Sequence, residues 1–117
     1  MSAWKRRWVR LKPNRIFSLI GLATKAGKTV SGEFMTEREV KSGKATLVIV
    51  AEDSSENTKK NFRNMCEFYK VPIRFYGDKD SLGHAMGKQF RASLAVLDQG
   101  FADGICKQID TKDETIA

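Results

Sequence analysis

The uninterrupted run of apolar and β-branched residues from Ala45 to Ala51 constrains the fold of this chain more than any other feature. A strand without an alternating polar face is typical of a sheet that is covered on both sides. A second, largely apolar run extends from Ala92 to Leu97 and predicts another buried strand. Because two such strands need helices on both faces of their sheet, the sequence predicts an α/β fold.

The segments around these runs carry apolar residues at helical spacing. In the first segment the spacing i, i+3, i+4, i+7 and i+10 is met by Ile16, Leu19, Ile20, Ala23 and Ala26. The expected helix caps are Asn14, then Asp53 or Ser54, and Asp98. We expect helices over about residues 15–26, 32–40, 54–71, 78–86 and 98–110, and strands over 29–31, 45–51, 73–76 and 92–97.

Helices and strands therefore alternate as αβαβαβαβα, which predicts a three-layer α-β-α sandwich with a mixed sheet of about four short strands. We place this single domain at residues 14–110, between a basic N-terminal tail (1–13) and a polar C-terminal tail (111–117). The N-terminal tail is expected to be an unstructured arm, either native to the protein or added to it. Trp4, Trp8 and Leu11 leave an RNA-binding arm or a membrane-surface helix as alternatives.

The net charge of +7 is concentrated at the N-terminus, because residues 1–15 hold six of the 21 basic residues and no acidic residue. The rest of the chain is nearly neutral, so it binds a polyanion only where its basic side chains share one face. The apolar run over 16–23 is too short to cross a membrane. Cys66 and Cys106 lie on apolar helical faces without metal-type spacing, which indicates buried free thiols and a reducing compartment. We expect a cytoplasmic protein without a membrane partner.

Few residues offer catalytic chemistry. Residues 22–29 differ by one position from a phosphate-binding P-loop, but the first glycine is missing and the segment ends a helix instead of opening one. His84 is the single histidine, and no cysteine–histidine cluster or nucleophile with an evident base accompanies it. We expect His84 to be a helix-end residue. We expect no catalytic residue, no metal site, no cofactor and no enzymatic activity.

Basic and amide-bearing side chains gather instead at predicted helix starts and in one loop. Helix N-termini offer unpaired N–H groups and a positive dipole end to phosphate. These side chains are Lys28, Lys59, Lys60, Lys88, Gln89 and Arg91, and Gly32 marks the helix start that follows Lys28. Phe90 is an aromatic residue in the same polar loop, where it either stacks on an extruded base or folds against the edge of the core.

Several motifs occur in a fixed order along the chain. They are Gly27-Lys28, Ser31-Gly32-Glu33, Lys41-Ser42-Gly43-Lys44-Ala45, Val48 to Asp53, and Leu82-Gly83-His84-Ala85-Met86-Gly87-Lys88 followed by Arg91-Ala92-Ser93. With this order the chain resembles the L-seven-Ae/L-thirty-e ribosomal protein superfamily, and in particular its bacterial YlxQ-type branch. The resemblance implies an α-β-α sandwich that binds kinked RNA helices through the start of its second helix and the loop before its last strand.

The chain departs from that family at the helix start. Typical members read Gly-x-Asn-Glu, with a lysine three residues after the glutamate. Here Gly32 matches the glycine, Phe34 and Met35 replace the asparagine and glutamate, and Arg38 keeps the positive charge. Phe34 and Met35 cannot make the polar contacts of Asn and Glu, and they would suit an apolar interface. A protein–protein adaptor that keeps the fold but has lost kink-turn recognition is therefore the alternative function.

The sequence and the resemblance together predict a non-catalytic RNA-binding protein of the ribosomal-protein type. We expect it to bind structured, kink-turn-like RNA, and ribosomal RNA is the RNA that we expect first. We also expect it to associate with the ribosome or with other ribosomal proteins. The RNA-binding residues that we expect are Lys28, Gly32, Glu33, Phe34, Arg38, Lys59, Lys60, Lys88, Gln89, Phe90 and Arg91.

Overall fold

Helices and strands alternate along the chain in the computed structural model, which describes residues 14–116 and the side chains of 14–111. The elements are α2 (Arg15–Lys25), β1 (Thr29–Ser31), α3 (Glu33–Lys41), β2 (Leu47–Val50), α4 (Glu56–Tyr69), β3 (Ile73–Phe75), α5 (Lys79–Ala85), β4 (Ser93–Val96) and α6 (Gln99–Ile116). This is the order that the sequence predicted. The expectations for residues 1–13 lie outside the described residues.

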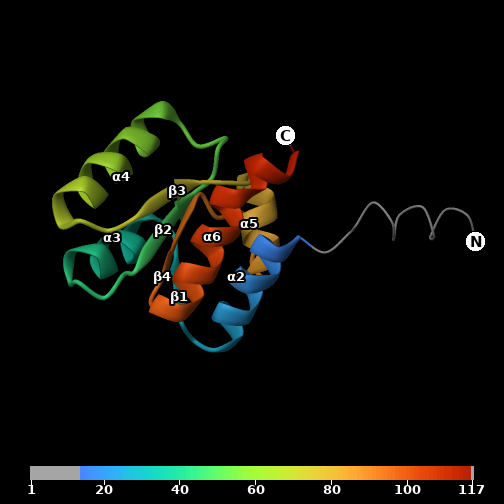
Figure 1. Ribbon diagram of the computed structural model, residues 1–117. Coiled ribbons are helices and arrows are strands. Elements are labelled where there is room, and N and C mark those ends of the chain that lie inside the picture. The colour runs from blue at the N-terminus through green and yellow to red at the C-terminus, as the bar shows by residue number, and fades with distance from the viewer. Residues whose placement is uncertain (1–13, 117) are drawn as a thin grey trace, which may run out of the picture.

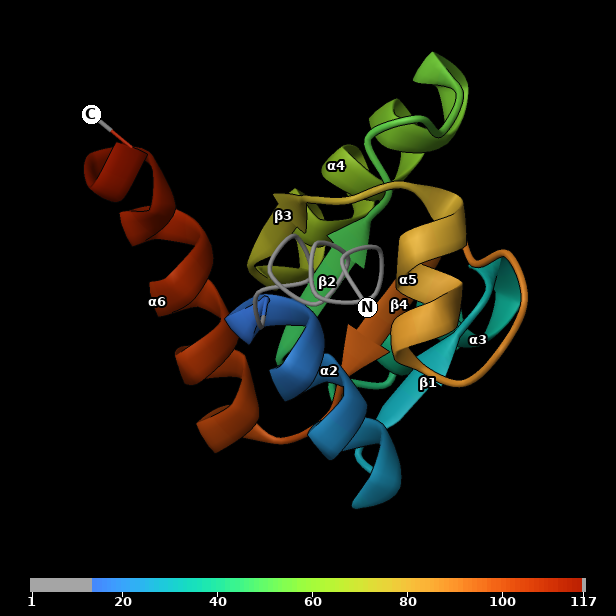
Figure 2. The same cartoon turned by 90° about the vertical axis from the view of Figure 1, so that its right-hand side faces the viewer.

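The sheet has four strands in the order β1-β4-β2-β3. Strands β2 and β3 are parallel, whereas β4 runs antiparallel to both β1 and β2, so the sheet is mixed as expected. Helices α2, α5 and α6 cover one face and α3 and α4 cover the other (Figure 1 and Figure 2). The three-layer α-β-α sandwich is confirmed.

The two runs are largely apolar because each strand supplies two separate cores. In β2, Leu47 and Ile49 pack into the cluster beneath α2, α5 and α6, while Val48 and Val50 pack into the cluster beneath α3 and α4. All four side chains are fully buried. Successive side chains of a strand point to opposite faces, so a strand covered on both faces favours apolar residues at successive positions.

The cap of α4 differs from the prediction. Ser55 is the N-cap residue and its side chain accepts a hydrogen bond of 3.1 Å from the Thr58 amide, so the expectation of Asp53 or Ser54 was wrong. Both residues have other partners across the fold. Asp53 accepts from the Lys79 amide at 3.0 Å, and the buried Ser54 hydroxyl is 3.4 Å from the carbonyl oxygen of residue 92.

The two ends of the described chain are helical. Asn14 caps α2 by accepting a hydrogen bond of 3.0 Å from the Phe17 amide, and Asp98 accepts from the Phe101 amide at 3.0 Å ahead of α6. Both caps were predicted. Helix α6 continues to Ile116 and so runs through the domain boundary suggested at residue 110. Among the helices in the described part of the chain, none is long and apolar enough to span a bilayer.

The two cysteines are free thiols, as expected, but only Cys66 is fully buried, whereas Cys106 is half-buried. Burial disfavours the charged thiolate and raises the pKa of Cys66 to about 11. The pKa of Cys106 is also raised by burial, and Arg74 nearby acts against that effect.

We predict that the native protein reacts slowly with iodoacetamide at pH 8, because only the thiolate is a strong nucleophile. Cys106 should be alkylated before Cys66, and the rate at Cys66 should rise as the pH approaches its pKa of about 11. Peptide mapping by mass spectrometry after timed alkylation measures both rates, with the denatured protein as the control. Faster modification of Cys66 than of Cys106 would contradict the deeper burial of Cys66.

Candidate nucleic-acid interface

Three helices begin at one edge of the sheet. Strands β1, β2 and β3 end at this edge and β4 begins there, as the pairing of Ser31 with Leu94 and of Val50 with both Ser93 and Phe75 shows. Helices α3, α4 and α5 start from it. We call it the helix-start edge and define it by residues 31–35, 51–60, 76–80 and 87–92. It contains most of the residues that the sequence singled out.

Gly32 forms the N-cap of α3 with a backbone conformation that favours glycine, φ 91° and ψ 156°. Its amide donates a hydrogen bond of 2.9 Å to the Ser93 carbonyl oxygen, which attaches the helix start to β4. No side chain caps this helix, whereas Ser55 and Asp78 cap α4 and α5. The first turn of α3 therefore presents uncapped N–H groups at the positive end of the helix dipole.

Arg91 ties the loop before β4 to the start of α3. Its Nε donates to the Ser31 hydroxyl at 2.9 Å, and another guanidinium nitrogen donates to the Phe90 carbonyl oxygen at 2.7 Å. Its backbone amide donates to the Lys79 carbonyl oxygen at 3.1 Å. Two segments that are 60 residues apart in sequence thus form one surface. Ser31 was missed as a site residue, because a lone serine ahead of a glycine carries no specific signal.

The same loop is held from the other side by Gly83 in α5. Gly83 is fully buried, and a Cβ atom at this position would overlap the Gln89 carbonyl group. The Lys88 amide donates a hydrogen bond of 2.8 Å to the Gly83 carbonyl oxygen. The sequence did not mark Gly83 as a site residue. A glycine within a helical pattern is a recognisable signal of close backbone approach, and it would have pointed to this contact.

Two aromatic side chains of this edge face solvent. Phe90 is 68% exposed and Phe34 is 74% exposed, so Phe90 does not fold against the core edge. Phe90 lines a hollow of about 490 Å³ together with Asp53, Asp78, Lys79 and Asp80. The Ser81 amide donates to Asp78 at 2.7 Å, and this bond lowers the pKa of the Asp78 carboxyl.

The remaining predicted cations are unequal in access. Lys60 and Lys88 are exposed, as are Gln89 and the acidic Glu33. The Lys59 side chain is only 19% exposed and its Nζ is 3.7 Å from a Glu56 carboxylate oxygen. Arg38 lies one to two turns into α3, is 55% exposed and pairs with Glu39 at 3.2 Å. Lys60 and Lys88 are therefore more accessible to a ligand than Lys59, whereas Arg91 is half-buried.

Lys28 lies at the opposite edge of the sheet. Its carbonyl oxygen accepts a hydrogen bond of 2.8 Å from the Leu97 amide, beyond the end of β4. The length of β1 separates it from Gly32, about 13 Å at the usual rise per residue of a strand. The structure thus does not bring Lys28 together with the other predicted site residues.

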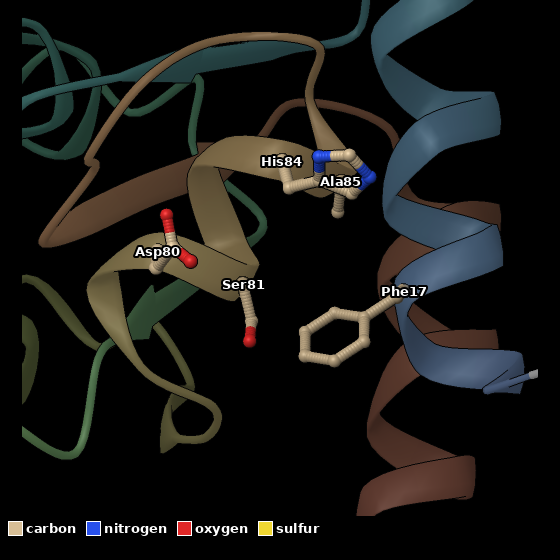
Figure 3. A pocket seen from close by; sticks show the side chains of 5 residues that line it. All are labelled: Phe17, Asp80, Ser81, His84 and Ala85. Carbon is tan, nitrogen blue, oxygen red and sulfur yellow. The ribbon is translucent and has the colours of Figure 1, made fainter. Parts of the chain in front are cut away.

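His84 and its neighbours form a shallow pocket of about 240 Å³ between α2 and α5, lined by Phe17, Asp80, Ser81, His84 and Ala85 (Figure 3). His84 lies in the last turn of α5 and is exposed, as predicted. No hydrogen bond joins it to Asp80 or Ser81 among the described residues. The side chains of Ser81 and Asp80 point away from each other, so these three residues lack the geometry of a catalytic triad.

Fold and site define an α-β-α sandwich domain that presents an uncapped helix start beside a cation-bearing loop. Residues 14–105 match the Ribosomal protein L7Ae/L30e/S12e/Gadd45 family, and the chain belongs to this family. It is 42% identical over 94 residues to "RNA-binding protein YlxQ" of Bacillus subtilis (strain 168), covering 80% of this chain and 94% of that protein. It is 32% identical over 97 residues to "Large ribosomal subunit protein eL30" of Trypanosoma brucei brucei, covering 81% and 92%.

The fold has a close counterpart among solved structures. A protein of unknown function from Bacillus halodurans C superimposes with a TM-score of 0.81 at 35% identity, covering 84% of this chain and 99% of that chain. The family resemblance that the sequence motifs indicated is confirmed. Neither the YlxQ protein nor the ribosomal subunit protein is named as an enzyme.

Proposed function

We propose that this protein is a non-catalytic RNA-binding protein that holds structured, kink-turn-like RNA at the helix-start edge. The observation that carries the proposal is the 2.9 Å bond between Arg91 and Ser31, which joins the cationic loop to the uncapped start of α3. Phosphate contacts fix an RNA helix on a protein, and uncapped helix N–H groups together with arginine are suited to that role. Relatives named as an RNA-binding protein and a ribosomal protein support it.

Each group on the edge has a distinct task in this proposal. Lys60, Lys88 and Arg91 hold phosphates, and Arg38 contributes from further along α3. Gly32 lets the RNA backbone approach the first turn of the helix. Phe90, exposed beside a hollow, stacks on a base that a kinked helix extrudes. The ribosome is the assembly and the cytoplasm the compartment that we propose, because a ribosomal subunit protein is among the relatives.

Phe34 supports a second candidate function. Its side chain is 74% exposed at the position where typical members carry a polar residue, and an exposed aromatic beside Met35 suits a protein interface. The protein would then be an adaptor that keeps the fold and binds a partner protein at this edge. Failure to bind any RNA at low salt would favour this function over the first.

We expect the protein to bind a kink-turn hairpin with an affinity that falls linearly with salt on a log–log plot, because phosphate neutralisation releases counterions. Arg91→Ala should lower affinity about tenfold for kinked and straight RNA alike, and reduce the salt slope by about 1. Arg91→Lys should restore the slope but not the full affinity, since lysine lacks the guanidinium fork. Fluorescence anisotropy at several salt concentrations measures both quantities.

The matched control is Lys44→Ala, which removes an exposed cation that precedes β2, at the end of that strand away from the helix-start edge. This variant should leave both the affinity for the kink-turn hairpin and the salt slope close to those of the wild type. A salt-independent affinity, or an Arg91→Ala protein that binds like the wild type, would count against RNA binding at this edge.

A further inference from the structure

The outer face of α4 carries an unusual set of side chains for a surface helix. We call it the α4 stripe and define it by Asn57, Lys60, Asn61, Asn64 and Phe68. These positions follow the spacing i, i+3, i+4, i+7 and i+11 and lie on one face of the helix. All five side chains are exposed, and the opposite face is buried through Phe62 and Cys66.

Stability does not explain the three asparagines. Asparagine is a poor helix former, because its side chain competes for backbone hydrogen bonds. Within residues 14–111, the carboxamides of Asn57, Asn61 and Asn64 have no hydrogen-bond partner in the protein. Each carboxamide offers both donors and an acceptor to solvent or to a ligand. Such groups suit a ligand that offers both acceptors and donors.

Phe68 marks one end of the stripe. It is 76% exposed, and its described ring contact is an edge-on pair with Tyr69 at 4.9 Å between ring centroids. The rest of the stripe is polar, so Phe68 does not belong to an apolar face of the kind that docks another protein. A single exposed aromatic beside amides and a lysine matches the stacking platforms of single-strand binding proteins.

The charge of Lys60 and the position of the stripe next to the helix-start edge both favour RNA as its ligand. The stripe contains Lys60, which also belongs to the helix-start edge, and the exposed Glu67 lies beside the stripe, three residues after Asn64. From Asn57 to Phe68 it runs about 17 Å away from that edge at the rise of an α-helix. Helix α4 lies on the outside of the sandwich, with the sheet on its inner side (Figure 1).

We propose that the α4 stripe binds a single-stranded RNA segment that extends from the structured RNA held at the helix-start edge. The carboxamides bind ribose hydroxyls, phosphates or base edges, Lys60 neutralises a phosphate where the two surfaces meet, and Phe68 stacks on an unpaired base. This inference rests on the proposed function, which supplies the RNA that reaches the helix.

The test uses the full chain and four RNA probes in fluorescence anisotropy. The probes are a blunt kink-turn hairpin, the same hairpin with about ten unpaired nucleotides at either its 5′ or its 3′ end, and the isolated single strand. We expect one of the two extensions to tighten binding by the wild type about tenfold, which is the scale of one base stacked on an aromatic ring. Phe68→Ala should abolish that gain and leave the blunt hairpin unaffected.

The double variant Asn61→Ala with Asn64→Ala separates binding from folding. It should lose most of the gain from the extension while its melting temperature rises by a few degrees, because alanine is the better helix former. Phe68→Tyr keeps the ring and should bind like the wild type. Glu67→Ala removes a negative charge beside the stripe and should strengthen binding slightly.

Three results would overturn the inference: no gain from either extension, a gain that survives Phe68→Ala, or equal losses for the blunt and extended hairpins. Failure of the proposed function gives a different pattern. The blunt hairpin would then not bind at all, and the isolated single strand would still bind in a manner that depends on Phe68.

Discussion

Replacing Gly83 with alanine should destabilise the protein by about 2 kcal/mol and displace the loop that carries Arg91. The added Cβ overlaps the Gln89 carbonyl group, and a backbone atom cannot rotate out of the way as a flexible side chain can. Moving the loop also weakens the 2.8 Å bond from the Lys88 amide to the Gly83 carbonyl oxygen. The intrinsic helix preference of alanine over glycine, about 1 kcal/mol, offsets only part of this loss.

The effect on RNA binding should exceed the effect on stability. The displaced loop separates Arg91 from Ser31, so affinity for a kink-turn hairpin should fall at least as far as in Arg91→Ala. Urea denaturation and anisotropy titrations measure the two effects on the same protein. An alanine variant with wild-type stability and affinity would show that the loop does not depend on this contact.

Gly104→Ala is the matched control for Gly83→Ala. Gly104 is also a helical glycine, and a Cβ there would make an ordinary contact of 3.6 Å with Leu19. Without a clash, alanine should stabilise the protein by up to about 1 kcal/mol. Two identical substitutions in two helices should therefore have opposite signs.

Phe62→Ala should destabilise the protein by about 3–5 kcal/mol, the largest effect that we expect of a single substitution. The Phe62 side chain is 1% exposed and packs with Val48, Val50 and Cys66 beneath α4. Removing it loses the burial of the ring and leaves a cavity that the surrounding strands cannot fill. Domains of this size have about 5–15 kcal/mol of stability in all, so the variant should be close to unfolding.

Phe68→Ala is the matched control on the same helix. The Phe68 side chain is 76% exposed, so its loss should change the free energy of unfolding by less than about 0.5 kcal/mol. Urea denaturation of the two variants measures the contrast. It also shows that an RNA-binding defect of Phe68→Ala does not come from unfolding. Equal destabilisation by the two substitutions would contradict an orientation of α4 that buries Phe62 and exposes Phe68.

Periodicity along the chain determined the elements and the layers. The run from Ala45 to Ala51 predicted a strand buried on both faces, and the structure confirms this because Leu47 and Val48 enter different cores. Asn14 and Asp98 were predicted as caps and are caps. These signals are local, since they depend on side chains within a few residues of one another.

The candidate site is where local signals were insufficient. Lys28 and Gly32 lie at opposite edges of the sheet although they are close in sequence, because strand β1, which the sequence itself predicted, lies between them. Tertiary structure decides the N-cap of α4, because Asp53 instead accepts a hydrogen bond from the Lys79 amide in α5. The sequence also left open whether Phe90 faces solvent or folds against the edge of the core. The folded chain decides this, because the Phe90 side chain is largely exposed.

By itself, then, the sequence determined which segments are helices and strands, that both faces of the sheet are covered, and which family's motifs the chain carries. Only the tertiary structure decided which residues share a surface. Arg91 meets Ser31 across 60 residues of sequence because the strand order β1-β4-β2-β3 places β1 beside β4. Gly83 meets the Gln89 carbonyl group because the loop after α5 folds back against that helix on its way to β4. Strand order and register arise from the simultaneous packing of two cores, and no short stretch of sequence encodes them.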